Sequence, residues 1–192
     1  MKLNKLQKKI GISFKDDKLL IQALTHKSFD TKNNYEKLEF LGDRVLGFVI
    51  SKKLLELYPN EKVGMIDKKL ANLVNKNKCF EIGKELELDN YILTGNTEKK
   101  KKVNIEKKII SDCCESLIGA IYIDKGFEVS SKFILNYWKN YLNLSDITVI
   151  DSKTRLQEYS LKKFKALPIY KLISNTGPRP VSYTHLRAHE TV

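Results

Sequence analysis

Prolines, cysteines and long apolar runs are all scarce in this sequence, and each shortage excludes a class of protein. Only one of the 4 prolines, Pro59, precedes residue 168, so most of the chain can form helices without interruption. The 3 cysteines, Cys79, Cys113 and Cys114, show no CxxC spacing, which argues against a disulfide framework and a zinc site. No apolar run approaches the roughly 18 residues that a membrane span needs.

The N-terminus also lacks the uninterrupted apolar stretch of a secretory signal. Residues 1–10 carry four lysines among their apolar residues. With neither a membrane span nor a signal in the sequence, we expect a cytoplasmic protein.

Acidic residues are fewer than basic ones, 23 against 35, and the net charge is +12. Such an excess favours a polyanionic partner such as nucleic acid. Basic surfaces also occur in proteins without any nucleic-acid role, so the charge by itself only nominates that partner. The balance of 42% hydrophobic and 30% charged residues is typical of a globular protein.

Apolar residues recur every three or four positions up to about Trp138, and this period predicts an all-helical first domain over residues 1–142. The expected helices span residues 2–10, 16–24, 33–57, 64–77, 78–87, 105–124 and 127–142. The lysine run at 99–102 falls between two of them. It is either a solvated loop or a contact for an RNA backbone.

The pattern changes after a linker at residues 143–150. Residues 151–178 predict an amphipathic helix and then a strand-like segment that ends in a turn, which is the beginning of an α/β unit. Residues 179–192 show no clear register, and we expect an unstructured tail that is not the natural continuation. His185 and His189 in this tail have helical i, i+4 spacing, but no third metal ligand accompanies them.

Three acids share one face of the expected helix 33–57. At 100° per residue, Glu36, Glu39 and Asp43 fall within about 60° of one another. Gly47 continues this acidic stripe one turn beyond Asp43.

The expected helix 105–124 repeats the arrangement, with Asp112 and Glu115 at i, i+3 and Gly119 one turn further on. A glycine inside a helix costs about 1 kcal/mol relative to alanine, so its place beside the acids in both helices needs a reason. A close crossing of the two helices would be such a reason. The acids would then converge into an all-oxygen cluster, which needs cations to stay ionised and suits Mg²⁺.

A simpler interpretation is that each group of acids is an exposed stripe balanced by nearby lysines. Either helix alone favours that interpretation. Both helices together, each with a glycine beside its acids and both in a basic protein, favour a metal site for phosphodiester hydrolysis.

The segment Glu36-Lys-Leu-Glu-Phe-Leu-Gly-Asp-Arg-Val-Leu46 resembles the signature of the ribonuclease III family. The similarity covers residues 6–142 and includes Ala-Leu-Thr-His-Lys-Ser at 23–28, Leu73-Val-Asn75 and the helix at 112–124. It implies an all-α ribonuclease III endonuclease domain that cuts double-stranded RNA with Mg²⁺, for which Mn²⁺ can substitute. The implied products have 5′-phosphate and 3′-hydroxyl ends with a short 3′ overhang, as in rRNA and mRNA processing.

The resemblance also assigns roles to residues. It implies that four acids bind the catalytic metal: Glu39, Asp43, Asp112 and Glu115. Glu36 is then an auxiliary acid near the cut, and Phe40 packs across a homodimer interface. Val63 stands where the family often has another acid, a departure that concerns one outer metal contact.

Residues 151–178 resemble the opening of a double-stranded RNA-binding domain, so the α/β unit is expected to be an incomplete one. The first helix of such domains lies in the RNA minor groove, which makes Thr154, Gln157 and Glu158 candidate 2′-OH contacts. A catalytically silent RNA-binding or ribosome-associated protein on the same fold is the competing reading. Relatives of that kind usually lack one or more of the acids, so the acids present here favour an enzyme.

Overall fold

The computed structural model describes residues 2–95, 105–144, 152–168, 171–176 and 183–187. They belong to two compact units, unit 1 at 1–147 and unit 2 at 148–192, which are described separately. The lysine run at 99–102 and most of the expected linker lie outside the described residues.

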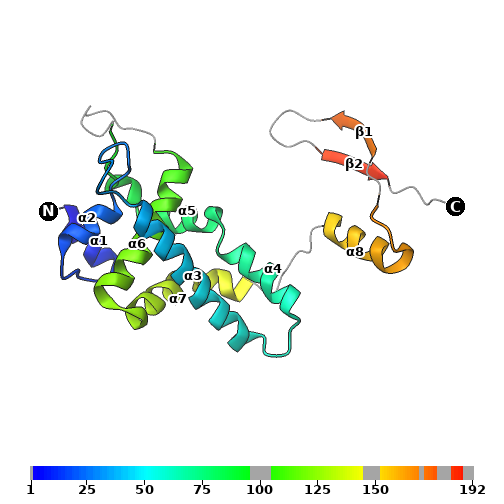
Figure 1. The fold of residues 1–192 in the computed structure, drawn as a ribbon, viewed down its shortest axis with the longest axis horizontal. Helices are drawn as coiled ribbons and strands as arrows, with labels where there is room; N and C mark the ends of the chain where they lie inside the picture. Colours follow the sequence, from blue (N-terminus) through cyan, green and yellow to red (C-terminus); the bar gives the residue numbers. More distant parts are fainter. Residues whose placement is uncertain (1, 96–104, 145–151, 169–170, 177–182, 188–192) are drawn as a thin grey trace. The chain divides into compact units, whose positions relative to one another are not determined.

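Unit 1 is helical, as expected for the nuclease domain (Figure 1). Its elements are α1 (Lys2–Ile10), α2 (Asp17–Ala23), α3 (Glu36–Leu57), α4 (Val63–Leu73), α5 (Lys76–Glu85), the short 3-10 helix η1 (Leu88–Asn90), α6 (Lys107–Lys125) and α7 (Phe127–Leu144). Among the described residues of unit 1, β pairing is confined to one isolated bridge between Thr25 and Leu93. The all-α prediction is therefore confirmed for this unit.

Side-chain hydrogen bonds explain where the observed helices begin. The expected helix 33–57 begins at Glu36, because the Asn34 side chain accepts a hydrogen bond from the Glu36 amide at 3.1 Å and holds the preceding residues in a turn. Asn75 separates α4 from α5. Its side chain accepts hydrogen bonds from the amides of Asn77 and Lys78, so a new helix begins there and not at residue 78.

The core forms around α6, whose residues from Ile110 to Ile121 are all buried. Helices α2, α3, α5 and α7 pack against it, and together they enclose α6 (Figure 1). Trp138 of α7 is fully buried, and its indole Nε1 donates a hydrogen bond to the Leu73 carbonyl at 2.8 Å. Polar residues carried on α6 are therefore held inside the domain by the packing of its apolar neighbours.

Helices α3 and α6 cross with their backbones in contact at Gly42 and Gly119. A methyl group on Gly42 would overlap the Glu115 carbonyl and lie 2.8 Å from the Gly119 amide nitrogen. A methyl group on Gly119 would overlap the Leu38 carbonyl. The close crossing predicted from the glycines is thus present.

The sequence pattern identified the wrong glycine on α3. Gly47 has nothing within 4 Å of the position that a Cβ atom would take, so it plays no part in the crossing. The contact falls at Gly42 because this residue shares the buried face of α3 with Leu38 and Val45, which lie one turn before it and one turn after it. The acidic stripe lies beside this face and not on it.

Unit 2 contains α8 (Ser152–Phe164) and the antiparallel strands β1 (Lys171–Thr176) and β2 (Tyr183–Arg187). The strands pair Lys171 with Arg187 and Thr176 with Tyr183, with an irregularity in between. The expectation that residues 179–192 hold no regular structure is therefore wrong for β2. The segment pairs with β1, a partner that its own short pattern cannot reveal.

The strand also changes the interpretation of the two histidines of the tail. His185 lies in β2, so the helical spacing to His189 does not apply, and His189 lies outside the described residues. The assignment of unit 2 to an incomplete RNA-binding domain stays a prediction.

None of the helices in the described part of the chain is both long enough and apolar enough to cross a membrane. The cytoplasmic location stays a prediction.

Gly42→Ala is expected to lower the free energy of unfolding by roughly 2 kcal/mol or more, because the added methyl group must push two helix backbones apart. Gly47→Ala is the matched control on the same helix. It places a methyl group in open space and should stabilise the protein by about 0.5–1 kcal/mol. Urea denaturation of the two variants measures both changes, and a neutral Gly42→Ala would contradict the close crossing.

Candidate metal centre

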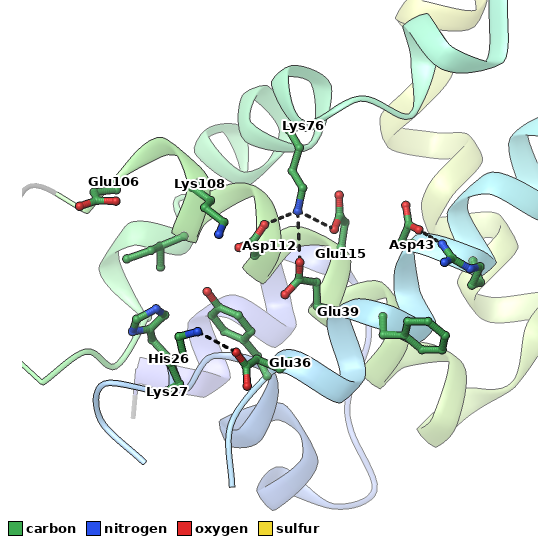
Figure 2. A pocket seen from close by; sticks show the side chains of 14 residues that line it. His26, Lys27, Glu36, Glu39, Asp43, Lys76, Glu106, Lys108, Asp112 and Glu115 are labelled. Atoms are coloured by element: carbon green, nitrogen blue, oxygen red, sulfur yellow. Dashed lines mark hydrogen bonds and ion pairs between the residues drawn. The ribbon is translucent and has the colours of Figure 1, made fainter. Parts of the chain in front are cut away.

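The crossing of α3 and α6 brings acids from both helices to one place (Figure 2). Glu39 lies on α3 just before Gly42, while Asp112 and Glu115 lie on α6 before Gly119. Because the backbones touch at the two glycines, Glu39 and Glu115 one turn away and Asp112 about two turns away must share a narrow space. One carboxylate oxygen from each of Glu39, Asp112 and Glu115 lies within 4.8 Å of the other two.

This three-acid cluster is buried on its α6 side. The side chains of Asp112 and Glu115 are only 6% and 4% exposed, and that of Glu39 is 24% exposed. Three carboxylates this close repel one another, and water can screen them only from one side. The cluster therefore needs a cation beside it, and three oxygen ligands at this spacing could hold a divalent metal ion.

Lys76, the first residue of α5, supplies a cation from the protein itself. Its Nζ lies 3.1 Å from Glu39 Oε1 and 3.3 Å from Glu115 Oε2, and it also donates to Asp112. Figure 2 shows the ammonium group pointing between the three acids. The sequence reasoning missed this residue. The available signal was a lysine in the first turn of a helix, where the helix dipole disfavours a positive charge.

Burial controls the protonation of the cluster. It raises the pKa of Glu115 to about 7, although the positive charge of Lys76 opposes the rise. Burial likewise raises the pKa of Glu39 against the hydrogen bond from Lys76. Burial alone would lower the pKa of Lys76, but the hydrogen bond to Asp112 and the charge of Glu115 outweigh it, and its pKa lies above the ordinary value.

Two predicted site residues lie beside the cluster without joining it. Asp43 forms an ion pair with Arg44, and a dashed line marks this contact at the Asp43 carboxylate in Figure 2. Glu36 pairs with Lys27, whose Nζ lies 3.1 Å from Glu36 Oε1. Three of the four acids predicted to bind the metal converge in the structure, whereas the Asp43 carboxylate pairs with the neighbouring guanidinium. The role of Asp43 as a metal ligand stays a prediction.

The cluster opens into a cavity of about 670 Å³ that Glu36, Asp43 and several basic residues also line. The basic lining residues are Lys27, Arg44, Lys76 and Lys108. His26 lines it as well, and burial together with the charge of Lys27 lowers its pKa below the usual 6.5. A cavity that combines an acidic cluster with basic residues could accept a phosphodiester beside a metal ion. Val63 is exposed on α4 and is not among the lining residues.

The remaining predicted residues are Phe40, which lines the same cavity, and three residues on α8 of unit 2. Phe40 is 65% exposed on α3, and the Arg44 guanidinium lies 5.0 Å from its ring centroid. Gln157 is half-buried on α8, and the same helix carries Thr154 and Glu158.

Comparison with known proteins gives consistent results. The family model described as Ribonuclease-III-like matches residues 16–142. Ribonuclease 3 of Pelagibacter ubique is 64% identical over 181 residues, which cover 93% of this chain and 81% of that protein. Ribonuclease 3 of Hahella chejuensis is 41% identical over 189 residues, which cover 97% and 83%. The chain belongs to the ribonuclease III family.

Structural similarity supports this membership. The nuclease domain of ribonuclease III from Campylobacter jejuni superposes with a TM-score of 0.66 at 36% identity, over 72% of this chain and 97% of that domain. The chain is accordingly an endoribonuclease that acts on RNA. The three-acid cluster lies within the matched residues and could bind the divalent metal that the family suggests.

Glu115→Gln is expected to raise the free energy of unfolding in EDTA by roughly 1–3 kcal/mol at pH 8 and by clearly less at pH 5. The folded protein holds the Glu115 proton up to about pH 7, whereas a glutamate of ordinary pKa, 4.5, releases it earlier. The free energy of unfolding of the wild type therefore falls as the pH rises from about 4.5 to about 7, because the unfolded chain releases this proton while the folded protein still holds it. Glutamine does not titrate, so the variant avoids this fall. Urea denaturation at the two pH values measures the difference.

Glu81→Gln is the control for this measurement. Glu81 is an exposed acid on α5 whose pKa is lowered by the hydrogen bond from Lys78. Glu81→Gln should lower the free energy of unfolding slightly at pH 8, whereas Glu115→Gln should raise it. An equal gain from Glu115→Gln at both pH values would contradict the raised pKa.

Proposed function

We propose that this endoribonuclease hydrolyses double-stranded RNA with Mg²⁺ held by Glu39, Asp112 and Glu115, and that Mn²⁺ can replace Mg²⁺. The observation that carries the proposal is the spacing of the three carboxylates, whose oxygens lie within 4.8 Å of one another. An all-oxygen donor set of this kind fits a hard divalent cation. Asp43 lines the same cavity and is proposed as the fourth acid once its carboxylate leaves Arg44.

The residues of the chain divide the work. A divalent ion in the cluster supplies Lewis-acid chemistry for phosphodiester hydrolysis. The acids hold the ion, and the buried surface of α6 limits the access of bulk water to them. Lys27, Arg44 and Lys108 line the cavity around the acids and can bind backbone phosphates, while Glu36 is an auxiliary acid near the cut. The proposed products have 5′-phosphate and 3′-hydroxyl ends.

Double-stranded RNA is the proposed substrate because two features of the chain suit a duplex. The net charge of +12 provides the electrostatic attraction that a polyanion requires. Unit 2 begins with α8, on which Thr154, Gln157 and Glu158 are proposed to contact 2′-hydroxyl groups in the minor groove. The proposed cellular role is the processing of rRNA and mRNA.

A homodimer is also part of the proposal. Phe40 exposes a large aromatic surface on α3, next to the cluster residue Glu39. The Campylobacter jejuni nuclease domain is described as having a region involved in dimer formation. Two subunits related by a two-fold axis would present two clusters to one duplex, which accounts for a staggered cut with a short 3′ overhang.

Glu115→Gln should reduce the rate of cleavage of a long RNA duplex by at least roughly 100-fold. Replacing a residue that only hydrogen-bonds to a metal ligand already lowers metal affinity or activity by about 10–100-fold, and Glu115 is proposed as a ligand itself. Duplex binding should change little, because the amide keeps the shape of the side chain. Single-turnover cleavage with Mg²⁺ or EDTA and a filter-binding assay separate the two effects. Glu81→Gln is the control, and a wild-type rate for Glu115→Gln with Mg²⁺ would refute the assigned role.

Phe40→Ala should shift the protein toward monomer, because the substitution removes an aromatic side chain that is 65% exposed in the single subunit. Leu55→Ala is the matched control. Leu55 is 58% exposed on the same helix and lies several turns from the acids. Sedimentation equilibrium measures both variants. An unchanged dimer with a lowered melting temperature would indicate that Phe40 serves only the stability of its own subunit.

A further inference from the structure

We propose that Lys76 is a built-in counter-cation that competes with the metal ion for the three-acid cluster and thereby sets the affinity of the site for the ion. The inference rests on the proposed metal site. It concerns what neutralises the three acids before an ion arrives and what the ion must displace.

The position of the ammonium group is the first argument. Nζ contacts one oxygen from each of the three acids, at 3.1 Å for Glu39 and 3.3 Å for Glu115, with Asp112 as the third partner. One oxygen of each acid lies within 4.8 Å of an oxygen of the other two, so little space remains between them. An ion that bridges all three would occupy the same point, and two cations cannot share it. Binding of the ion therefore requires Lys76 to leave.

The charge balance is the second argument. When all three carboxylates are ionised, they and the one ammonium group leave a net charge of about −2 in a partly buried place, so a divalent ion is still attracted. The ion must, however, replace contacts that already stabilise the acids. Its apparent affinity is reduced by the free energy of displacing Lys76, in the way that any competing ligand reduces affinity.

The structure also provides a way for Lys76 to leave. Its side chain is 53% exposed, although its two α6 partners are almost fully buried. The Asn75 cap holds the first turn of α5 through hydrogen bonds to the amides of Asn77 and Lys78. The flexible lysine side chain can therefore rotate toward solvent while the backbone stays in place. Exchange between ammonium and ion needs no rearrangement of the helices.

The test is isothermal titration of Mn²⁺ and of Mg²⁺ into the full chain without RNA. Lys76→Met keeps the length of the side chain without its charge, and it should bind each ion about tenfold more tightly, equivalent to about 1.4 kcal/mol. Lys76→Arg keeps the charge and should retain the weak binding of the wild type. In EDTA, Lys76→Met should melt at a lower temperature, and Mg²⁺ should raise that temperature more than it does for the wild type.

Lys108→Met is the matched control. Lys108 lines the same cavity, yet among the described residues no acid lies within ion-pair distance of it. Its substitution removes the same unit of charge from the cavity without freeing the cluster, so affinity should rise less than about twofold. If Lys76→Met does not fold, Lys76→Gln replaces it in the same titration.

The outcomes are distinguishable. If the wild type binds the ions and the uncharged Lys76 variant binds them no more tightly than Lys108→Met, the competition is refuted while the metal site stands. If neither the wild type nor the Lys76 variant binds either ion, the metal site itself is wrong and the inference falls with it. A tighter Lys76→Met together with a weakly binding Lys76→Arg supports the proposal.

Discussion

Direct contact between two helix backbones is the constraint on which the site depends. Helices normally pack about 8–10 Å apart, with side chains between them. At Gly42 and Gly119 no side chain intervenes, and each glycine lies against a carbonyl group of the other helix. Acids within about two turns of these glycines on α3 and α6 are thereby brought into one group. A methyl group at either glycine would separate the helices and widen the spacing that lets three carboxylates act together.

The position of the cluster inside the domain follows from the burial of α6. Apolar residues of α2, α3, α5 and α7 pack against this helix, and their packing offsets the cost of burying Asp112 and Glu115 beside them. The raised pKa of Glu115 shows that the cost is not fully compensated by Lys76. The buried acids thus lower the free energy of unfolding, and a bound cation would raise it again. Proteins commonly hold their functional groups in this condition.

Residues of the same type around the cluster differ in what they contact. Lys76 points into the acids, whereas Lys108 lines the same cavity without an ion pair among the described residues. Asp43 and Glu36 each have a basic partner of their own, so the cavity presents balanced charges around a cluster whose acids outnumber its one cation. The excess negative charge of the cavity is therefore found at the three-acid cluster, where a metal ion would be attracted. Membership of the ribonuclease III family is consistent with this arrangement.

The sequence by itself determined the helical nature of unit 1, the two acidic stripes and the family, because apolar period and local spacing are properties of neighbouring residues. It also indicated that the helices cross at glycines. Only the tertiary structure decided that Gly42 and not Gly47 forms the crossing, that Asp43 pairs with Arg44, and that β2 forms in the tail. The contact of Lys76 with the acids was likewise decided only by the tertiary structure, because Lys76 lies 36 residues from Asp112 in the chain. The helical period gives the direction of a side chain on its own helix but not the residue that it contacts on another helix.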